Sequence, residues 1–265
     1  MYRKIVDFHA HAFHDKIAEK AAKNLNEYYG IPLAGNGRFQ VLLDSMEENH
    51  IDTLVVHATA TKPEQVPVIN DYMAGLVAPH IVGFGTLHPD YPMWQKELDR
   101  FADLGLHGVK FHPIFQGFRV DDASMYPIYE QLEGRLPVLM HMGDVNVDYA
   151  TPERLLHVMT DFPKLTVVAA HLGSYHDYWH AQKCLADLEN LYVDTSSAIR
   201  FLEPEEATRV IRAYGTERVL FGTDYPLSLH KEELAIFDKL ALSEEEKEQI
   251  LWKNAYQLLG VPMEK

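Results

Sequence analysis

The sequence predicts an α/β protein, a (β/α)8 TIM barrel formed by a single domain. Eight short hydrophobic, β-branched runs recur along the 265 residues, and helix-length segments separate them. From the second run onward, the runs start roughly 25 to 29 residues apart, which suits βα units with short loops. The runs are nearly continuous in hydrophobicity, as expected of parallel strands covered on both faces.

Each run is expected to form one barrel strand, and the segments between the runs are expected to be helical. Thr151 before Pro152 is typical of an N-cap followed by proline in the first helical turn. A doubly wound open sheet is the alternative, but it normally carries a Gly-rich nucleotide loop after its first strand, and this chain has none there. The runs are KIVDFH from Lys4, DTLVVHA from Asp52, IVGFGTLHP from Ile81, HGVKFHP from His107, LPVLMHMG from Leu136, LTVVAAHLG from Leu165, LYVDTSS from Leu191 and RVLFGTDYP from Arg218.

Two segments lie outside this repeat. Residues 12–40 form an insertion after the first strand, with one helix and then a Gly- and Pro-containing loop. Loops at this position lie at the mouth of a barrel, so the insertion is a candidate lid or pocket wall. Residues 243–260 are expected to form a closing helix, because Ser243 and Glu246 have the spacing of a capping box.

The composition excludes several classes of partner. The chain has 24 basic and 39 acidic residues, a net charge of −15, which disfavours nucleic acids and anionic membranes. A lone cysteine cannot form an internal disulfide, and no apolar stretch reaches the length of a membrane span or resembles a signal peptide. We therefore expect a cytoplasmic protein that acts on a small molecule.

Polar residues recur where the predicted strands end. Because all strands of a parallel barrel end on one face, residues far apart in the sequence converge there. The first strand carries two histidines two positions apart, and such residues face the same side of a strand. The strand-end residues are His9, His11, His57, His88, Lys110, His112, His141, His171 and Asp224.

These residue types indicate a metal site. A catalytic Zn²⁺ takes three or four nitrogen or oxygen ligands and keeps one position open for water. Zinc is the expected metal, at one divalent ion per chain, and manganese is the alternative. Asp224 is also a candidate acceptor of a proton from the bound water, with His171 as general acid, general base or electrophile. The candidate ligands are His9, His11, His141 and Asp224.

Seven motifs occur in a fixed order: DFHAH, GVKFHP, LPVLMHMG, VVAAHLG, VDTSS, LFGTDYP and ILWKNAYQLLG. Together, over roughly residues 4–260, they resemble the amidohydrolase superfamily, in particular the amidohydrolase-related family that includes aminocarboxymuconate-semialdehyde decarboxylase. The resemblance implies a distorted (β/α)8 barrel with a mononuclear metal site, usually zinc.

The resemblance also implies roles for individual residues. His9 and His11 match the ligand pair of strand one, and His141 matches the ligand of strand five. Asp224 matches the strand-eight aspartate, which is both ligand and proton acceptor. His171 matches a strand-six histidine that serves catalysis more than ligation in mononuclear members.

Lys110 has two interpretations. In binuclear amidohydrolases a strand-four lysine is carbamylated and bridges two metals. We favour an unmodified cation at the floor of the pocket or behind the ligands. His57 and His112 join Lys110 as candidate substrate-binding residues, although a lone strand-end histidine is equally often a hydrogen-bonded structural residue.

Two reactions suit this ligand set. The first is hydrolysis of a small lactone, ester or amide by a metal-bound hydroxide. The alternative is non-oxidative decarboxylation of a small carboxylic acid, which calls for a cation near the metal and a dry cavity. Arg119 and Arg200 are the candidate arginines for holding an anionic group. A barrel that binds a ligand without turnover is a third hypothesis, and it would need an incomplete metal set.

Aromatic residues of the insertion leave the oligomeric state open. Tyr28, Tyr29 and Phe39 are candidates for a homodimer contact, for the pocket wall or for packing of the insertion onto the barrel.

Overall fold

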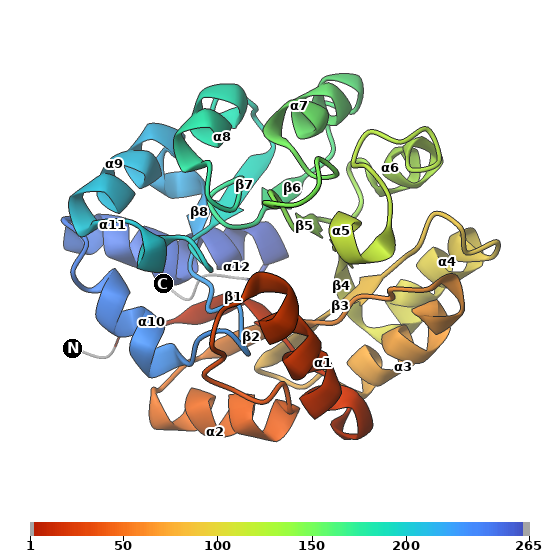
Figure 1. Ribbon diagram of the computed structural model, residues 1–265, viewed down its shortest axis with the longest axis horizontal. Helices are drawn as coiled ribbons and strands as arrows, with labels where there is room; N and C mark the ends of the chain where they lie inside the picture. Colours follow the sequence, from red (N-terminus) through yellow and green to blue (C-terminus); the bar gives the residue numbers. More distant parts are fainter. Residues whose placement is uncertain (1–2, 262–265) are drawn as a thin grey trace.

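Eight parallel strands form one sheet in the order of the sequence, as the computed structural model shows for residues 3–261 (Figure 1). Neighbouring strands pair in parallel throughout. All eight hydrophobic runs contain a strand, so the predicted single-domain (β/α)8 barrel is confirmed. The strands are β1 (Val6–His11), β2 (Thr53–His57), β3 (Ile81–Thr86), β4 (Leu106–Phe111), β5 (Val138–Met140), β6 (Val167–Ala169), β7 (Leu191–Asp194) and β8 (Val219–Leu220).

The barrel closes along a seam between β1 and the segment that continues β8. Backbone hydrogen bonds join Phe8 N to Phe221 O at 2.8 Å, Asp224 N to His9 O at 2.8 Å, and His11 N to Tyr225 O at 2.9 Å. Because β8 proper is only two residues long, most of this seam uses chain beyond it. Three of the four predicted metal ligands, His9, His11 and Asp224, therefore lie along the seam, whereas His141 follows β5.

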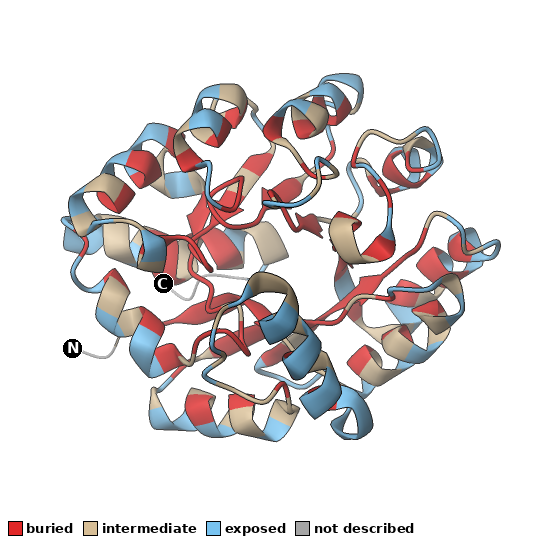
Figure 2. Cartoon of the chain, in the orientation of Figure 1, coloured by how far each residue is buried: buried red, intermediate tan, exposed pale blue. Residues whose placement is uncertain are grey.

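Helices surround the strands and present their buried faces to the sheet (Figures 1 and 2). Thr151 caps α7 as predicted, since its side chain accepts a hydrogen bond from Arg154 N. The α-helices are α1 (Asp15–Tyr29), α2 (Phe39–Glu48), α3 (Val66–Leu76), α4 (Trp94–Leu104), α5 (Pro113–Gln116), α6 (Tyr126–Leu132), α7 (Pro152–Asp161), α8 (Tyr178–Leu185), α9 (Pro204–Tyr214), α10 (His230–Phe237), α11 (Glu244–Glu248) and α12 (Asn254–Leu259). Short 3-10 turns are η1 (Pro63–Gln65), η2 (Ile199–Phe201) and η3 (Thr216–Arg218), and η4 (Gln249–Lys253) is π-helical.

Two apolar layers make up the core. The larger fills the space between the strands and the surrounding helices. The smaller lies inside the barrel and includes Phe8 and Phe84, whose rings pack edge to face with centroids 5.7 Å apart. Residues of η4 and α12, such as Trp252 and Tyr256, pack against this inner layer. The floor of the barrel is thus apolar, and its polar residues gather at the other end.

The insertion after β1 covers that polar end of the barrel. It contains one helix, α1, followed by an irregular stretch, as predicted, but it ends at residue 38 and not 40 because α2 begins at Phe39. Phe39 packs against the larger apolar layer. We call residues 12–38 the lid segment; in Figure 1 its helix crosses in front of the strands.

The closing helix predicted for residues 243–260 is present but interrupted. Ser243 and Glu246 form the predicted capping box at the start of α11. The π-helical turn of η4 then separates α11 from α12. Within residues 3–261, no helix combines the length and apolar character that crossing a membrane requires.

Candidate metal centre and active site

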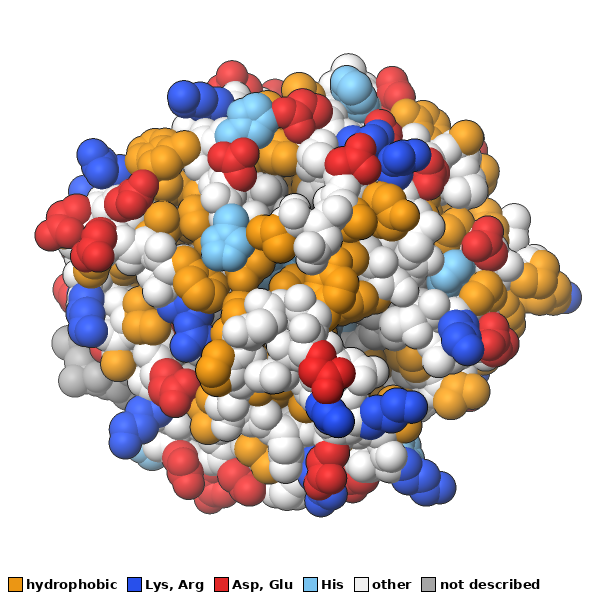
Figure 3. All heavy atoms as spheres, in the orientation of Figure 1, with side chains coloured by type: hydrophobic (Ala, Val, Ile, Leu, Met, Phe, Trp, Pro, Cys, Tyr) orange, Lys and Arg blue, Asp and Glu red, His pale blue; other side chains and the backbone are white. Residues whose placement is uncertain are grey.

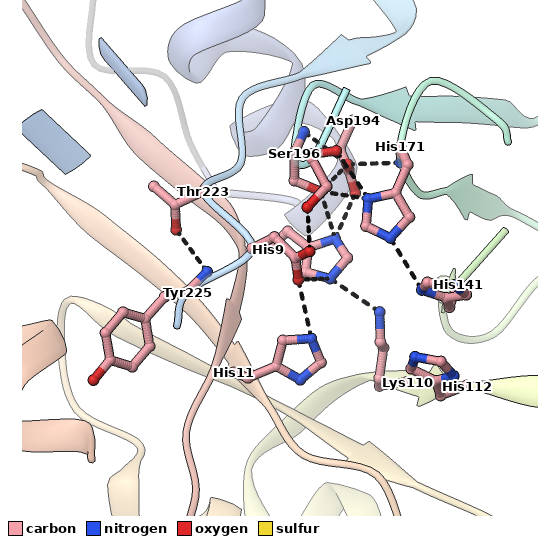
Figure 4. A network of polar contacts seen from close by, with 12 residues as sticks. His9, His11, Lys110, His112, His141, His171, Asp194, Ser196, Thr223 and Tyr225 are labelled. Atoms are coloured by element: carbon pink, nitrogen blue, oxygen red, sulfur yellow. Dashed lines mark hydrogen bonds and ion pairs between the residues drawn. The ribbon is translucent and has the colours of Figure 1, made fainter. Parts of the chain in front are cut away.

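The structure brings the strand-end residues together at one end of the barrel (Figure 4). They come from β1, β2 and β4 and from the segments that directly follow β4, β5, β6 and β8. Most of the side chains are buried, whereas those of His11 and Asp224 are 12% and 18% exposed, in line with a site that opens toward a pocket. The residues brought together are His9, His11, His57, Lys110, His112, His141, His171 and Asp224.

An irregularity in β1 allows this arrangement. The register of β1 against β2 shifts between Asp7 and Ala10. Phe8 can therefore join the inner apolar layer while its neighbour His9 joins the polar cluster. His9 and His11 lie on the same side, as predicted, with ring centroids 5.4 Å apart. A bulge next to an active site commonly redirects a side chain in this way.

Hydrogen bonds hold His9 in one tautomer. Its Nδ1 lies 2.8 Å from Asp194 Oδ2, and a carboxylate of low pKa only accepts, so Nδ1 carries the proton. Nε2 of the neutral ring then keeps a lone pair, which faces Lys110 Nζ at 3.1 Å. A carboxylate behind a ligating histidine fixes the ring and raises its basicity as a ligand.

The spacing of three donor atoms fits a bound metal ion. Asp224 Oδ1 lies 3.4 Å from His9 Nε2 and 3.2 Å from His11 Nε2. Four ligands at about 2.0 Å around a tetrahedral Zn²⁺ are separated from one another by roughly 3.3 Å. The donor set therefore matches the cation that the sequence predicts, in both chemistry and spacing.

A second pair of nitrogens also converges. His171 Nδ1 donates to Ser196 O at 2.8 Å, and His141 Nε2 donates to Gly143 O at 3.1 Å. With these protons placed, the lone pairs of His171 Nε2 and His141 Nδ1 face each other at 3.0 Å. Two such lone pairs repel unless a proton or a cation lies between them. The contact fits a cation bound beside His141.

Two residues of the site have unfavourable backbone conformations. His171 and Asp224 have φ angles of 61° and 55°, in the left-handed region that non-glycine residues rarely adopt. Such conformations cost on the order of 1–3 kcal/mol each and cluster at functional sites. Backbone hydrogen bonds from His171 N to Asp194 Oδ1 and from Asp224 N to His9 O hold them in place.

Burial decides the charges in the site. Desolvation lowers the pKa of His11 to about 4 and that of Lys110 to about 8. Desolvation alone would raise the pKa of Asp224, but a hydrogen bond with His11 and electrostatic interactions with His9 and His171 hold this pKa well below its ordinary range. Burial lowers the pKa of both His11 and His171, so the site pairs an ionised carboxylate with neutral imidazoles at these two positions, the protonation states that metal binding requires.

A pocket opens above these donors. Its floor is polar and includes His11, His141, His171 and Asp224. Its wall is mostly apolar and aromatic, and much of it comes from the lid segment. Seen onto the same face, apolar side chains gather over the centre of the barrel (Figure 3). The wall residues are Leu25, Tyr29, Ile31, Leu33, Tyr175, Pro226 and Leu227.

Not every residue singled out from the sequence reaches the pocket. Arg119 is half exposed and its Nε lies 3.6 Å from Asp148 Oδ1, outside the pocket lining. Arg200 is also not part of the pocket lining; its Nη1 donates to Ser228 Oγ at 3.0 Å, next to the wall residue Leu227. His112 lines the pocket and stacks on His141 with ring centroids 3.9 Å apart. Among the candidate cations Lys110, Arg119 and Arg200, Lys110 is the one buried beside the donor atoms.

The site also contains residues that the sequence argument did not single out. Asp194 and Ser196 orient His9 and His171, and Ser197 hydrogen-bonds to Asp224 Oδ2. The motif VDTSS could have indicated Asp194, because this residue ends β7 just as the other site residues lie at strand ends. The sequence does not indicate that Asp194 contacts His9, because 185 residues separate the two; the structure shows this contact.

Comparisons with known proteins agree with this geometry. The sequence model of the amidohydrolase family matches residues 6–261, so the chain belongs to that family. A TIM-barrel protein of unassigned function from Bordetella bronchiseptica superposes with a TM-score of 0.81 at 23% identity, covering 97% of this chain and 99% of its own.

Two decarboxylases share the same fold. The 5-carboxyvanillate decarboxylase of Sphingomonas paucimobilis superposes with a TM-score of 0.78 at 18% identity, covering 98% of this chain and 100% of its own. The dihydroxybenzoic acid decarboxylase of Polaromonas sp. JS666, solved with bound manganese, gives 0.74 at 19% identity and covers 98% of both chains. The resemblance to the amidohydrolases is therefore confirmed by the family model, and the two decarboxylases share the barrel fold.

Proposed function

We propose that this protein is a metal-dependent, non-oxidative decarboxylase of a small carboxylic acid with a flat, apolar body. One observation carries the proposal: the polar floor that holds the donors lies under a wall that is mainly apolar and aromatic. The sequence argument required a dry cavity and a cation near the metal. Buried Lys110, 3.1 Å from His9 Nε2, meets the second requirement. The decarboxylases of the same fold support the choice.

The proposed metal site consists of one divalent cation, held by His9, His11 and Asp224 together with His141. Zinc is the expected ion, and the manganese of the Polaromonas enzyme makes manganese the alternative. When bound, the cation offsets negative charge on the substrate and on the electron-rich state that follows loss of CO2.

The apolar wall favours the reaction by excluding water. A carboxylate loses much favourable hydration free energy in such a pocket. The CO2 that forms from it is neutral, so it loses little hydration free energy there. Breaking the carbon–carbon bond leaves an electron pair on the substrate carbon, and a proton must reach that carbon. The wall residues Tyr29 and Tyr175 suit the flat face of an aromatic ring.

Asp224 and His171 are the residues placed to move that proton, because both line the pocket. Asp224 is ionised, so it can accept the proton that an acidic substrate group loses and return it to the carbon after CO2 leaves. His171 is fixed by Ser196 O with its Nε2 lone pair directed toward His141.

Hydrolysis of a small lactone, ester or amide is the second candidate function. The ionised state of Asp224 is compatible with it, because an unprotonated carboxylate at the pocket floor has an acceptor site for a proton from water. The two candidates share the same residues and differ in the substrate bond that breaks.

The test starts with metal content per chain in protein purified without chelator or added metal. Protein with its metal would then be given 2,6-dihydroxybenzoate and 5-carboxyvanillate, with CO2 release as the readout, and a panel of lactones and aryl esters, with acid release as the readout. We expect about one metal per chain and metal-dependent CO2 release. Release of acid from the lactones or esters, without CO2 release from the carboxylic acids, would favour hydrolysis over decarboxylation. Protein that binds no metal would exclude both functions.

Asp224→Asn tests the proton transfer. This variant keeps the shape of the side chain and removes the charge, so we expect turnover to fall by more than about a hundredfold, roughly 2.7 kcal/mol in barrier. Retention of turnover within about tenfold would exclude the proton-transfer role of Asp224. Circular dichroism and metal content would confirm that the variant is folded and loaded.

A further inference from the structure

His57 is a buried histidine without a hydrogen-bond partner. Its side chain is fully inaccessible to solvent, and within residues 3–261 neither Nδ1 nor Nε2 has a polar partner. Burial of an unsatisfied polar group costs on the order of 1–3 kcal/mol. Most buried polar groups in folded proteins are satisfied, so an imidazole with neither nitrogen paired calls for a partner.

The strand register aims His57 at the metal donors. His57 pairs with His11 between β1 and β2, so the two side chains project side by side into the barrel. The ring centroid of His57 lies 4.4 Å from that of His11 and 4.9 Å from that of His9, in edge-to-face arrangements. One nitrogen from each of the three rings lies within 4.8 Å of the other two.

The surroundings of His57 suit a bound cation, because neither nitrogen of its ring has a polar partner within residues 3–261. A neutral imidazole is the form that ligates zinc, manganese and related ions. The negative charge that a cation needs here comes from Asp224 and Asp194, which contact His11 and His9.

We propose that His57 is an additional ligand of the divalent cation held by His9 and His11. The cation would satisfy the acceptor nitrogen of His57 and would bring a third barrel strand, β2, into a metal site otherwise assigned to β1, β5 and β8. This inference rests on the proposed metal site but not on the reaction that the site performs. It adds a residue that the ligand set read from the sequence does not include.

The experiment compares His57→Phe with wild type, both first stripped of metal and then titrated with Co²⁺. Phenylalanine keeps the ring and removes both nitrogens. We expect the visible absorption bands of bound cobalt to shift, because these bands report the number and type of ligands. We also expect Zn²⁺ affinity, measured by competition with a chromogenic chelator, to fall at least a hundredfold. An unchanged cobalt spectrum overturns the proposal, with or without a loss of affinity.

A thermal measurement separates ligation from packing. If His57 is a ligand, metal-free His57→Phe should melt no lower than metal-free wild type, while the rise in Tm on adding Zn²⁺ should shrink. If the ring only packs, the variant should lose the same Tm with and without metal, which overturns the proposal. His57→Gln, which keeps a polar end but offers a poor ligand, provides the same comparison should the phenylalanine variant fail to fold.

His88→Phe is the matched control. His88 is also a buried histidine just beyond a barrel strand, but its Nδ1 accepts a hydrogen bond from Asp90 N at 3.2 Å. This variant should leave the cobalt spectrum and the Zn²⁺ affinity unchanged. If wild type binds no metal, the proposed metal site itself is refuted. If wild type and His57→Phe bind metal equally tightly, only the role of His57 is refuted.

Discussion

Two clusters in this molecule bring metal-binding side chains together, and they differ in what supports them. In the barrel, His9 is fully buried and its Nδ1 is held by Asp194 at 2.8 Å. On the surface, Glu153 of α7 faces His180 and Cys184 of α8, one turn apart, with ligand atoms also within 4.8 Å of one another. The distances between ligand atoms therefore do not distinguish the two clusters.

The difference lies in the groups behind the ligands. In the barrel, a carboxylate fixes the ring of His9 and leaves a lone pair on its other nitrogen. At the surface, His180 and Glu153 are about half exposed, and burial together with the charges of Glu153 and Asp177 raises the pKa of the Cys184 thiol. A thiol must lose its proton to bind a metal, so the surface cluster is the weaker site. Proximity of donors is therefore not enough; their orientation and protonation decide.

Loss of the supporting carboxylate should have the largest effect. Asp194→Asn keeps an acceptor for His9 but removes the charge, and we expect Zn²⁺ affinity to fall by about 10- to 100-fold. Chelator competition measures this change. Asp187→Asn, the same substitution at an exposed position, is the control and should bind as wild type does. Equal affinity of Asp194→Asn and wild type would mean that the support behind His9 does not distinguish the two clusters.

The neutral state of the buried imidazoles should make stability depend on pH. Burial lowers the pKa of five imidazoles of the site, and that of His88 outside it, so as the pH falls below 6.5 the unfolded chain takes up protons that the folded chain does not bind. We expect the free energy of unfolding of metal-free protein to fall between pH 7 and pH 5.5 by more than about 1.4 kcal/mol per pH unit, the slope for one proton. The five residues are His11, His57, His112, His141 and His171.

Urea unfolding at the two pH values measures this slope. The buried Glu233 acts in the opposite direction, because desolvation raises its pKa to about 8 and the folded chain then holds a proton that the unfolded chain releases. Glu233→Gln removes this opposing contribution and should make the fall between pH 7 and pH 5.5 steeper. A flat profile in both proteins would contradict the description of the site as a set of neutral imidazoles.

The smallest effect is expected at the surface cluster. Cys184→Ala should leave the metal content per chain unchanged and alter the free energy of unfolding by less than about 0.5 kcal/mol, as is usual for surface positions. Elemental analysis and urea unfolding provide the two values. A loss of one metal per chain in this variant would show that the exposed cluster binds as well as the buried one does.

The sequence predicts the position of a site residue better than its contacts. The period of two and the strand-end position correctly place His9 and His11 on one side of β1. The strand-end position also places His57 in the site, at the end of β2. That neither of its ring nitrogens has a hydrogen-bond partner depends on packing from several strands. Arg119 follows β4 in the chain, yet the conformation of its loop turns it toward Asp148. Loop conformation and distant pairings, such as that of Asp194 with His9, depend on tertiary contacts that local patterns do not report.

The seam of the barrel has a consequence for biosynthesis. The ribosome releases His9 long before Asp224, because more than 200 residues separate them in the sequence. Because backbone bonds from Asp224 and Tyr225 to β1 close the barrel, the donor set can assemble only when β8 and the segment after it dock on β1. Contacts of such large sequence separation form slowly. The nascent chain must therefore keep β1 unpaired on one side, and the proposed metal site exists only once the barrel is closed.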